Sequence, residues 1–165
     1  MKNIISCIII CISMMLTGAK AQVLSTSNQP SQTSSRSRIA AGPSVYGVFA
    51  GRTPCREFMK DLNMGERMEC AKRKMGITLY QDSITHDPTT YETWGMGKWT
   101  GIGKWKILKG TPTDPQATIF QIILDEKTSL FLLKGDENVL FILDHHKDFL
   151  VGNAEYSYTL NRARN

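Results

Sequence analysis

The sequence predicts a mainly β protein, a small antiparallel meander β-barrel of about seven or eight strands with one short helix near residues 54–64. Three observations support this fold class. Short segments in which apolar and polar residues alternate recur at spacings of roughly 10–15 residues. Residues that favour turns separate these segments. No helical pattern lies between the later strands, so the crossovers of a parallel sheet are excluded.

The first 21 residues have the pattern of a cleaved secretory signal. Lys2 precedes an apolar run over 4–16, which is too short for a membrane-spanning helix. We expect cleavage after Ala21 and export to the periplasm or the exterior, with no later membrane span. A lipid anchor is not expected, because Gln22 and not cysteine follows the predicted cleavage point.

Residues 22–44 are rich in Ser, Thr and Gln, and this composition predicts a flexible leader. Residues 45–165 then form one β-barrel domain of a size that can bury a single core. The whole chain carries a formal charge of +5, but the part from Val45 onward has 16 basic and 15 acidic residues. A near-neutral domain argues against nucleic acid as a partner.

The elements are predicted in order from their residues. A first strand over 45–51 ends at Gly51, and Thr53 and Pro54 supply the N-cap and first position of the helix. Gly65 ends that helix. The segments expected to form the remaining strands are 69–81, 89–94, 105–111, 117–124, 130–134, 139–143 and 156–161.

Two cysteines, Cys55 and Cys70, remain once the predicted signal is removed. In an oxidising compartment this pair predicts a disulfide, and closing such a loop stabilises a fold by about 3 kcal/mol. The alternative is a soft-metal site in which Met59 and Met68 add thioether ligands suited to Cu(I). Methionines close to a helix are more commonly core filler, which favours the disulfide.

His145 and His146 form the one histidine pair in the sequence. They lie in a predicted turn between Asp144 and Asp148, where a solvated polar loop is the favoured interpretation. Capture of a metal ion at the surface is the alternative.

Four aromatic residues, Tyr91, Trp94, Trp99 and Trp105, lie in a segment interrupted by glycines. At a barrel rim they can line a pocket for a small hydrophobic or glycan-like ligand. Because Trp94 and Trp105 fall on predicted strands, we expect both in the core. Trp99 lies between glycines and is the expected exposed contact.

The sequence contains none of the common catalytic motifs, and its carboxylates lie mostly at predicted turns. We therefore expect no enzymatic activity and no cofactor. The predicted function is a binding module for a small ligand. A structural or protein-interaction factor that contacts an envelope protein is the alternative.

Several short motifs follow one another in a characteristic order: Tyr46-Gly47-Val48-Phe49-Ala50-Gly51, Thr53-Pro54-Cys55, Ile77-Thr78-Leu79, Gly103-Lys104-Trp105 and Leu143-Asp144. Over about residues 46–144 this order resembles the N-terminal domain of the copper resistance lipoprotein NlpE and its relatives. The resemblance implies a small lipocalin-like barrel and a role in envelope stress signalling or copper handling.

One departure from the family pattern bears on function. The family has a Cys-x-x-Cys motif, whereas Phe58 stands three residues after Cys55 and the next cysteine is Cys70. The resemblance therefore implies the fold, and the copper and signalling roles remain alternatives.

Overall fold

A computed structural model of the chain describes residues 33–34, 39–65 and 70–164. The predicted signal, residues 1–21, and most of the predicted leader lie outside the described residues. Within the described part of the chain, no helix is long and apolar enough to cross a membrane.

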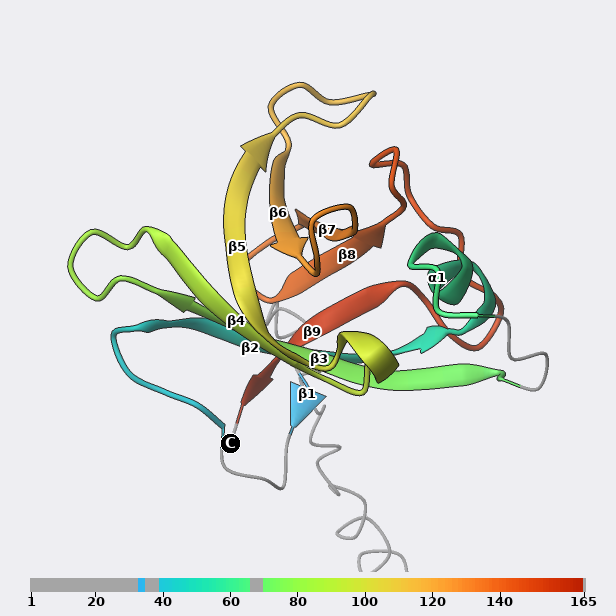
Figure 1. The fold of residues 1–165 in the computed structure, drawn as a ribbon, viewed down its shortest axis with the longest axis horizontal. Coiled ribbons are helices and arrows are strands. Elements are labelled where there is room, and N and C mark those ends of the chain that lie inside the picture. The colour runs from blue at the N-terminus through green and yellow to red at the C-terminus, as the bar shows by residue number, and fades with distance from the viewer. Residues whose placement is uncertain (1–32, 35–38, 66–69, 165) are drawn as a thin grey trace, which may run out of the picture.

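Eight antiparallel strands close into a barrel (Figure 1), which confirms the predicted fold class. Each strand from β2 to β8 pairs with the next one in sequence, and β9 closes the barrel between β8 and β2. The strands are β2 (Val45–Pro54), β3 (Lys72–Gln81), β4 (Pro88–Trp94), β5 (Gly101–Lys109), β6 (Thr118–Ile123), β7 (Ser129–Lys134), β8 (Val139–Leu143) and β9 (Thr159–Arg164).

A two-residue strand, β1 (Thr33–Ser34), lies beside the end of β9. It pairs in parallel with Ala163 and Arg164. Part of the predicted leader is therefore attached to the barrel by backbone pairing.

The barrel interior is filled by side chains. In β3, Met75, Ile77 and Leu79 are fully buried, which follows the predicted alternation along this strand. All eight barrel strands contribute to the same core cluster, for example through Phe49 of β2 and Leu160 of β9. Burial of this apolar surface supplies the main driving force for folding.

The helix α1 (Arg56–Asp61) follows β2 directly and is shorter than predicted. The predicted N-cap role of Thr53 and helical position of Pro54 are wrong, because both residues extend β2 and pair with β3. Cys55 is the N-cap instead, without a side-chain cap hydrogen bond. Backbone pairing with the neighbouring strand thus outweighs the local helix-start signal.

The helix covers one end of the barrel, which we call the α1 end. Phe58 and Leu62 point from it into the core cluster, as the sequence predicts. Three other connections lie at the same end: the β4–β5 connection with the short 3₁₀ helix η1 (Gly97–Trp99), the β6–β7 turn, and the long β8–β9 loop.

Candidate functional site

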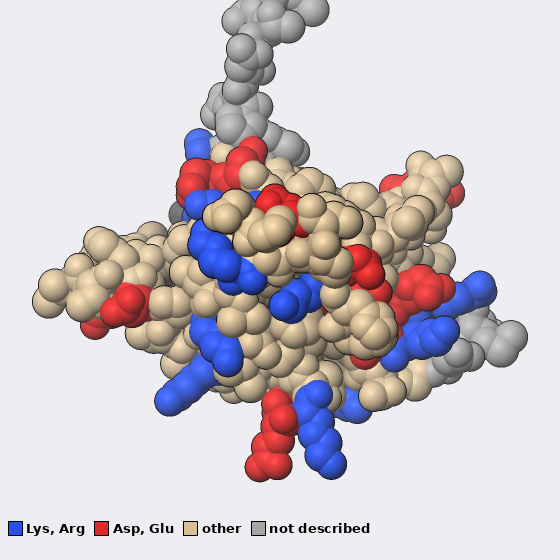
Figure 2. Space-filling model, turned by 90° about the horizontal axis from the view of Figure 1, so that it is seen from above, with Lys and Arg blue, Asp and Glu red and all other residues tan. Residues whose placement is uncertain are grey.

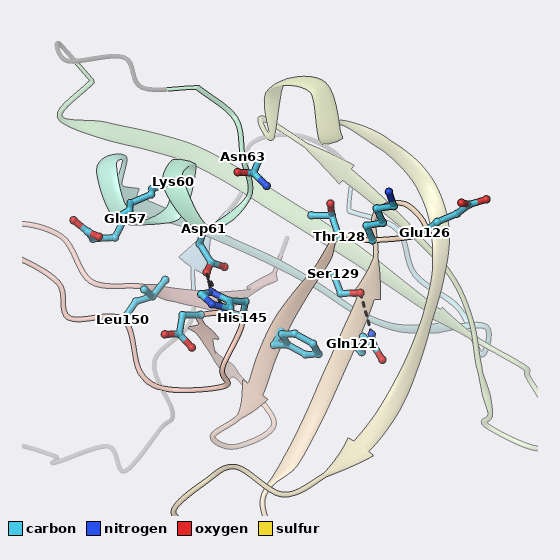
Figure 3. Close-up of a pocket in the computed structure, with 13 residues that line it drawn as sticks. Glu57, Lys60, Asp61, Asn63, Gln121, Glu126, Thr128, Ser129, His145 and Leu150 are labelled. Atoms are coloured by element: carbon cyan, nitrogen blue, oxygen red, sulfur yellow. Dashed lines mark hydrogen bonds and ion pairs between the residues drawn. The ribbon is translucent and has the colours of Figure 1, made fainter.

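A hollow of about 750 Å³ opens at the α1 end (Figure 3), and we call it the rim hollow. Three parts of the chain line it: α1 with the residues that follow it, the β6–β7 hairpin, and the β8–β9 loop. The α1 side contributes Glu57, Lys60, Asp61 and Asn63. The rim hollow is separate from the filled interior and is the candidate site of this protein.

Asp61 links α1 to the β8–β9 loop. Its Oδ1 lies 2.6 Å from Nδ1 of His145 and accepts a second hydrogen bond, of 3.0 Å, from the His145 backbone N–H. The Asp61 side chain is 10% exposed and the His145 side chain 63%. The hydrogen bond to Asp61 raises the pKa of His145, and the charges of Asp61 and Asp144 act in the same direction.

Asp144 shapes the loop that carries His145. Its Oδ1 accepts hydrogen bonds from the backbone N–H groups of His146 and Asp148, at 2.8 and 2.9 Å. This arrangement is the turn that the sequence predicts. The rings of His145 and His146 lie 3.8 Å apart between centroids, and only His145 lines the hollow.

The opposite wall comes from the β6–β7 hairpin. Gln121 Nε2 donates a hydrogen bond of 2.9 Å to Ser129 Oγ on the neighbouring strand (Figure 3). In the turn, Asp125 Oδ1 accepts from the backbone N–H groups of Lys127 and Thr128, and these bonds lower the pKa of Asp125. Phe131 adds an apolar ring to this wall.

The lining of the rim hollow is polar and carries more acid than base. Its charged residues are the carboxylates of Glu57, Asp61, Glu126 and Asp144, and the ammonium groups of Lys60 and Lys127, besides His145. An excess of carboxylates disfavours anionic ligands and favours neutral or cationic ones. The face seen in Figure 2 carries interspersed basic and acidic side chains.

Two of the aromatic residues predicted to bind ligand lie inside the barrel. Trp105 is 3% exposed, as expected for a core residue, and its Nε1 donates to the Tyr80 carbonyl at 2.7 Å. Tyr91 is equally buried and donates from Oη to the Ile123 carbonyl at 2.9 Å. Its ring crosses Gly103, where a Cβ would come within 2.7 Å of the ring. Neither side chain lines the rim hollow.

The expectations for the other two tryptophans are wrong in opposite directions. Trp94 is 37% exposed and lies outside, because the alternation of β4 turns Tyr91 and Thr93 inward. Trp99 in η1 is half-buried, packs against the core, and donates from Nε1 to the Leu62 carbonyl at 3.1 Å. Neither lines the rim hollow. The glycines beside Trp99 suggested exposure, but η1 folds its ring onto the end of α1.

Cys55 and Cys70 form the predicted disulfide, with their Cα atoms 5.7 Å apart. Their sulfurs are therefore bonded to each other and do not provide thiolates for the alternative metal site. Met59 lies on the buried face of α1, whereas Met68 lies outside the described residues. Within the described part of the chain, no group of three or more His, Cys, Asp or Glu residues is placed to hold a metal ion.

Sequence reasoning found one residue of the rim hollow, His145, and missed the rest. Asp61 and His145 are 84 residues apart, and no local pattern links them. Gln121 lies in a segment whose alternating pattern predicts a strand but gives no sign of a binding site.

Comparison with protein-family models, with curated proteins and with solved structures gives no match. The resemblance to the NlpE family therefore stays a prediction of the sequence motifs.

Proposed function

We propose that this protein is an exported, non-enzymatic binding module that takes a neutral, hydroxyl-rich ligand, such as a glycan, in the rim hollow. One observation carries the proposal. The interior is filled by side chains, whereas the rim hollow offers about 750 Å³ surrounded by hydrogen-bonding groups. Binding sites generally combine such a concave surface with a few well-placed polar groups.

Export is supported by two features. The first 21 residues have the composition of a secretory signal. The Cys55–Cys70 disulfide is of a kind that forms and persists in oxidising compartments. The resemblance to an envelope protein family agrees with this placement.

The chemistry of the lining supports a polar ligand. The amides of Asn63 and Gln121 and the hydroxyl of Thr128 both donate and accept hydrogen bonds, which suits sugar hydroxyls. Phe131 and Leu150 supply apolar surface for the C–H face of a ring. The excess of carboxylates weighs against sulfated or phosphorylated ligands. A hydrophobic ligand of lipocalin type would need interior space that side chains occupy.

Isothermal titration calorimetry on the mature chain tests the proposal. The probes are neutral malto-, cello- and chito-oligosaccharides, with palmitate as an apolar probe. We expect one-to-one binding of at least one oligosaccharide class and no binding of palmitate. If none of the three oligosaccharide classes binds, or if palmitate binds with one-to-one stoichiometry, the proposal is wrong.

A matched pair of glutamine variants locates the site. Gln121→Ala removes an amide from the lining and, at about 1 kcal/mol per hydrogen bond, should weaken oligosaccharide binding about fivefold. Gln116→Ala changes an exposed glutamine in the β5–β6 connection at the other end of the barrel and should have no effect. Equal affinities of the two variants would place the ligand elsewhere.

A further inference from the structure

The outer face of β2 to β5 presents a surface that the rim hollow does not use. Tyr91 and Trp105 point into the barrel, so residues an odd number of positions away along β4 and β5 point outward. The same alternation turns Arg52 of β2 and Lys74 of β3 outward, where they are direct cross-strand partners. We call this surface the cationic wall; it consists of Arg52, Lys74, Trp94, Ile102, Lys104 and Lys106.

The cationic wall carries four basic side chains, and one acidic residue, Glu92, lies within it as the cross-strand partner of Ile102. Glu92 is the one acidic residue on the outward positions of these four strands. None of the four basic residues forms an ion pair with another described residue. Lys74 and Lys104 stand two strands apart, about 10 Å across the sheet, and the register separates them by about six residues, roughly 20 Å, along it, so the cations form an elongated strip. Their charge is therefore available to an external anionic surface.

Two apolar side chains lie among these cations. Ile102 is 76% exposed and stands opposite Glu92, and Trp94 is 37% exposed two positions further along β4. The Trp94 indole lies flat on β3 over Gly76, where any side chain would overlap it. The Lys74 ammonium is 5.7 Å from the Trp94 ring centroid. The indole is thus held in a fixed place at the surface.

We propose that the cationic wall docks on a membrane surface rich in anionic phospholipid. Each basic residue near such a surface adds attraction, and tryptophan is favoured at the interface between headgroups and acyl chains. An exposed isoleucine between the cations gains from contact with acyl chains. An acidic polysaccharide would use the cations but would leave Ile102 in water. The combination of charge and apolar side chains therefore favours lipid.

This surface is distinct from the proposed ligand site. The rim hollow is built from α1, the β6–β7 hairpin and the β8–β9 loop, none of which contributes to the cationic wall. Docking through the wall therefore leaves the rim hollow outside the contact. The two proposals can fail independently.

Vesicle flotation with the mature chain tests the docking. The probes are neutral phosphatidylcholine vesicles and vesicles that contain about 30% phosphatidylglycerol. We expect the protein to float with the anionic vesicles only, and less so as salt rises and screens the attraction. Equal binding to both kinds of vesicle, or to neither, would overturn the proposal.

Charge-matched variants identify the surface. Lys104→Gln with Lys106→Gln should weaken binding to the anionic vesicles about 25-fold, at about fivefold for each basic residue. Arg56→Gln with Lys147→Gln removes the same charge at the α1 end, and we expect a much smaller loss. Comparable losses in the two double variants would contradict docking through the wall.

The apolar contact has its own test. Ile102→Ser replaces a side chain that is 76% exposed and lies outside the core cluster, and it should reduce vesicle binding several-fold. Dextran sulfate serves as an acidic polymer without acyl chains. If the protein binds dextran sulfate as tightly as it binds vesicles, and Ile102→Ser changes neither, the partner is an acidic polymer and the lipid proposal is wrong.

Discussion

The barrel interior and the α1 end use polar groups in different ways. Inside, the Trp105 indole and the Tyr91 hydroxyl are bonded to backbone carbonyls. At the α1 end, Asp61, Asp144 and Asp125 fix loops through bonds to backbone N–H groups, and many polar side chains still face the rim hollow. The polar groups inside thus serve the fold alone, whereas Asp61 and Asp144 both fix loops and line the rim hollow.

The largest expected effect is a loss of stability when a side chain of the barrel interior, and not one of the rim hollow, is truncated. Trp105→Ala removes a buried indole and its hydrogen bond, and should lower the free energy of unfolding by about 3–5 kcal/mol. Phe131→Ala at the rim hollow should cost much less, because this ring is only partly buried. Chemical denaturation measures both variants. Similar losses would show that the rim is as structural as the core.

The second-largest expected effect concerns the Cys55–Cys70 disulfide. It joins residues 15 positions apart around α1, and a loop of this length contributes about 3 kcal/mol by constraining the unfolded chain. Cys55→Ser with Cys70→Ser should lower the free energy of unfolding by this amount. Amide hydrogen exchange should quicken first in α1, which forms one wall of the rim hollow. Unchanged stability in the double variant would contradict a structural role.

A smaller effect concerns the contact between η1 and α1. Trp99→Phe keeps a six-membered aromatic ring but removes the bond from Nε1 to the Leu62 carbonyl, and loss of that hydrogen bond alone costs about 1 kcal/mol. Thermal unfolding measures this loss, with Trp94→Phe as the control on the exposed face. If Trp94→Phe proved the more destabilising, the assignment of the two tryptophans would be reversed.

The smallest effect depends on pH. Asp61 raises the pKa of His145 above its ordinary value of 6.5, so the charged pair forms more readily in the folded state. Its stabilisation is complete below the unfolded pKa of about 6.5 and is lost as pH rises through the higher folded value. Titration of the His145 ring protons by NMR measures the shift, and Asp61→Asn should lower the pKa. An unchanged pKa in that variant would remove Asp61 as the cause.

Much of the fold could be predicted because alternation and turn residues are local signals. The β8 strand over 139–143 and the turn after it follow directly from the sequence. The helix start could not, because the pairing of Thr53 and Pro54 with β3 is a long-range effect. The rim hollow was missed for the same reason, since only folding brings Asp61 to His145.

The tryptophans show how a local signal can mislead. Trp94 was expected in the core because it falls on a predicted strand, yet the phase of the alternation, set by Tyr91, places it outside. Trp99 looked exposed because glycines flank it, yet its ring finds a carbonyl acceptor on a distant segment. For these residues, the position in the alternating pattern of a strand predicts burial better than the type of side chain does.

The central claim is that ligands bind at the rim hollow and not inside the barrel. An NMR screen of polar and apolar fragments against the ¹⁵N-labelled mature chain tests it most directly. We expect polar fragments to shift the amides of α1, of 124–131 and of 144–150, while those of Leu79, Leu132 and Leu140 stay unchanged. Apolar fragments that shift the interior amides and leave the rim unaffected would contradict the account.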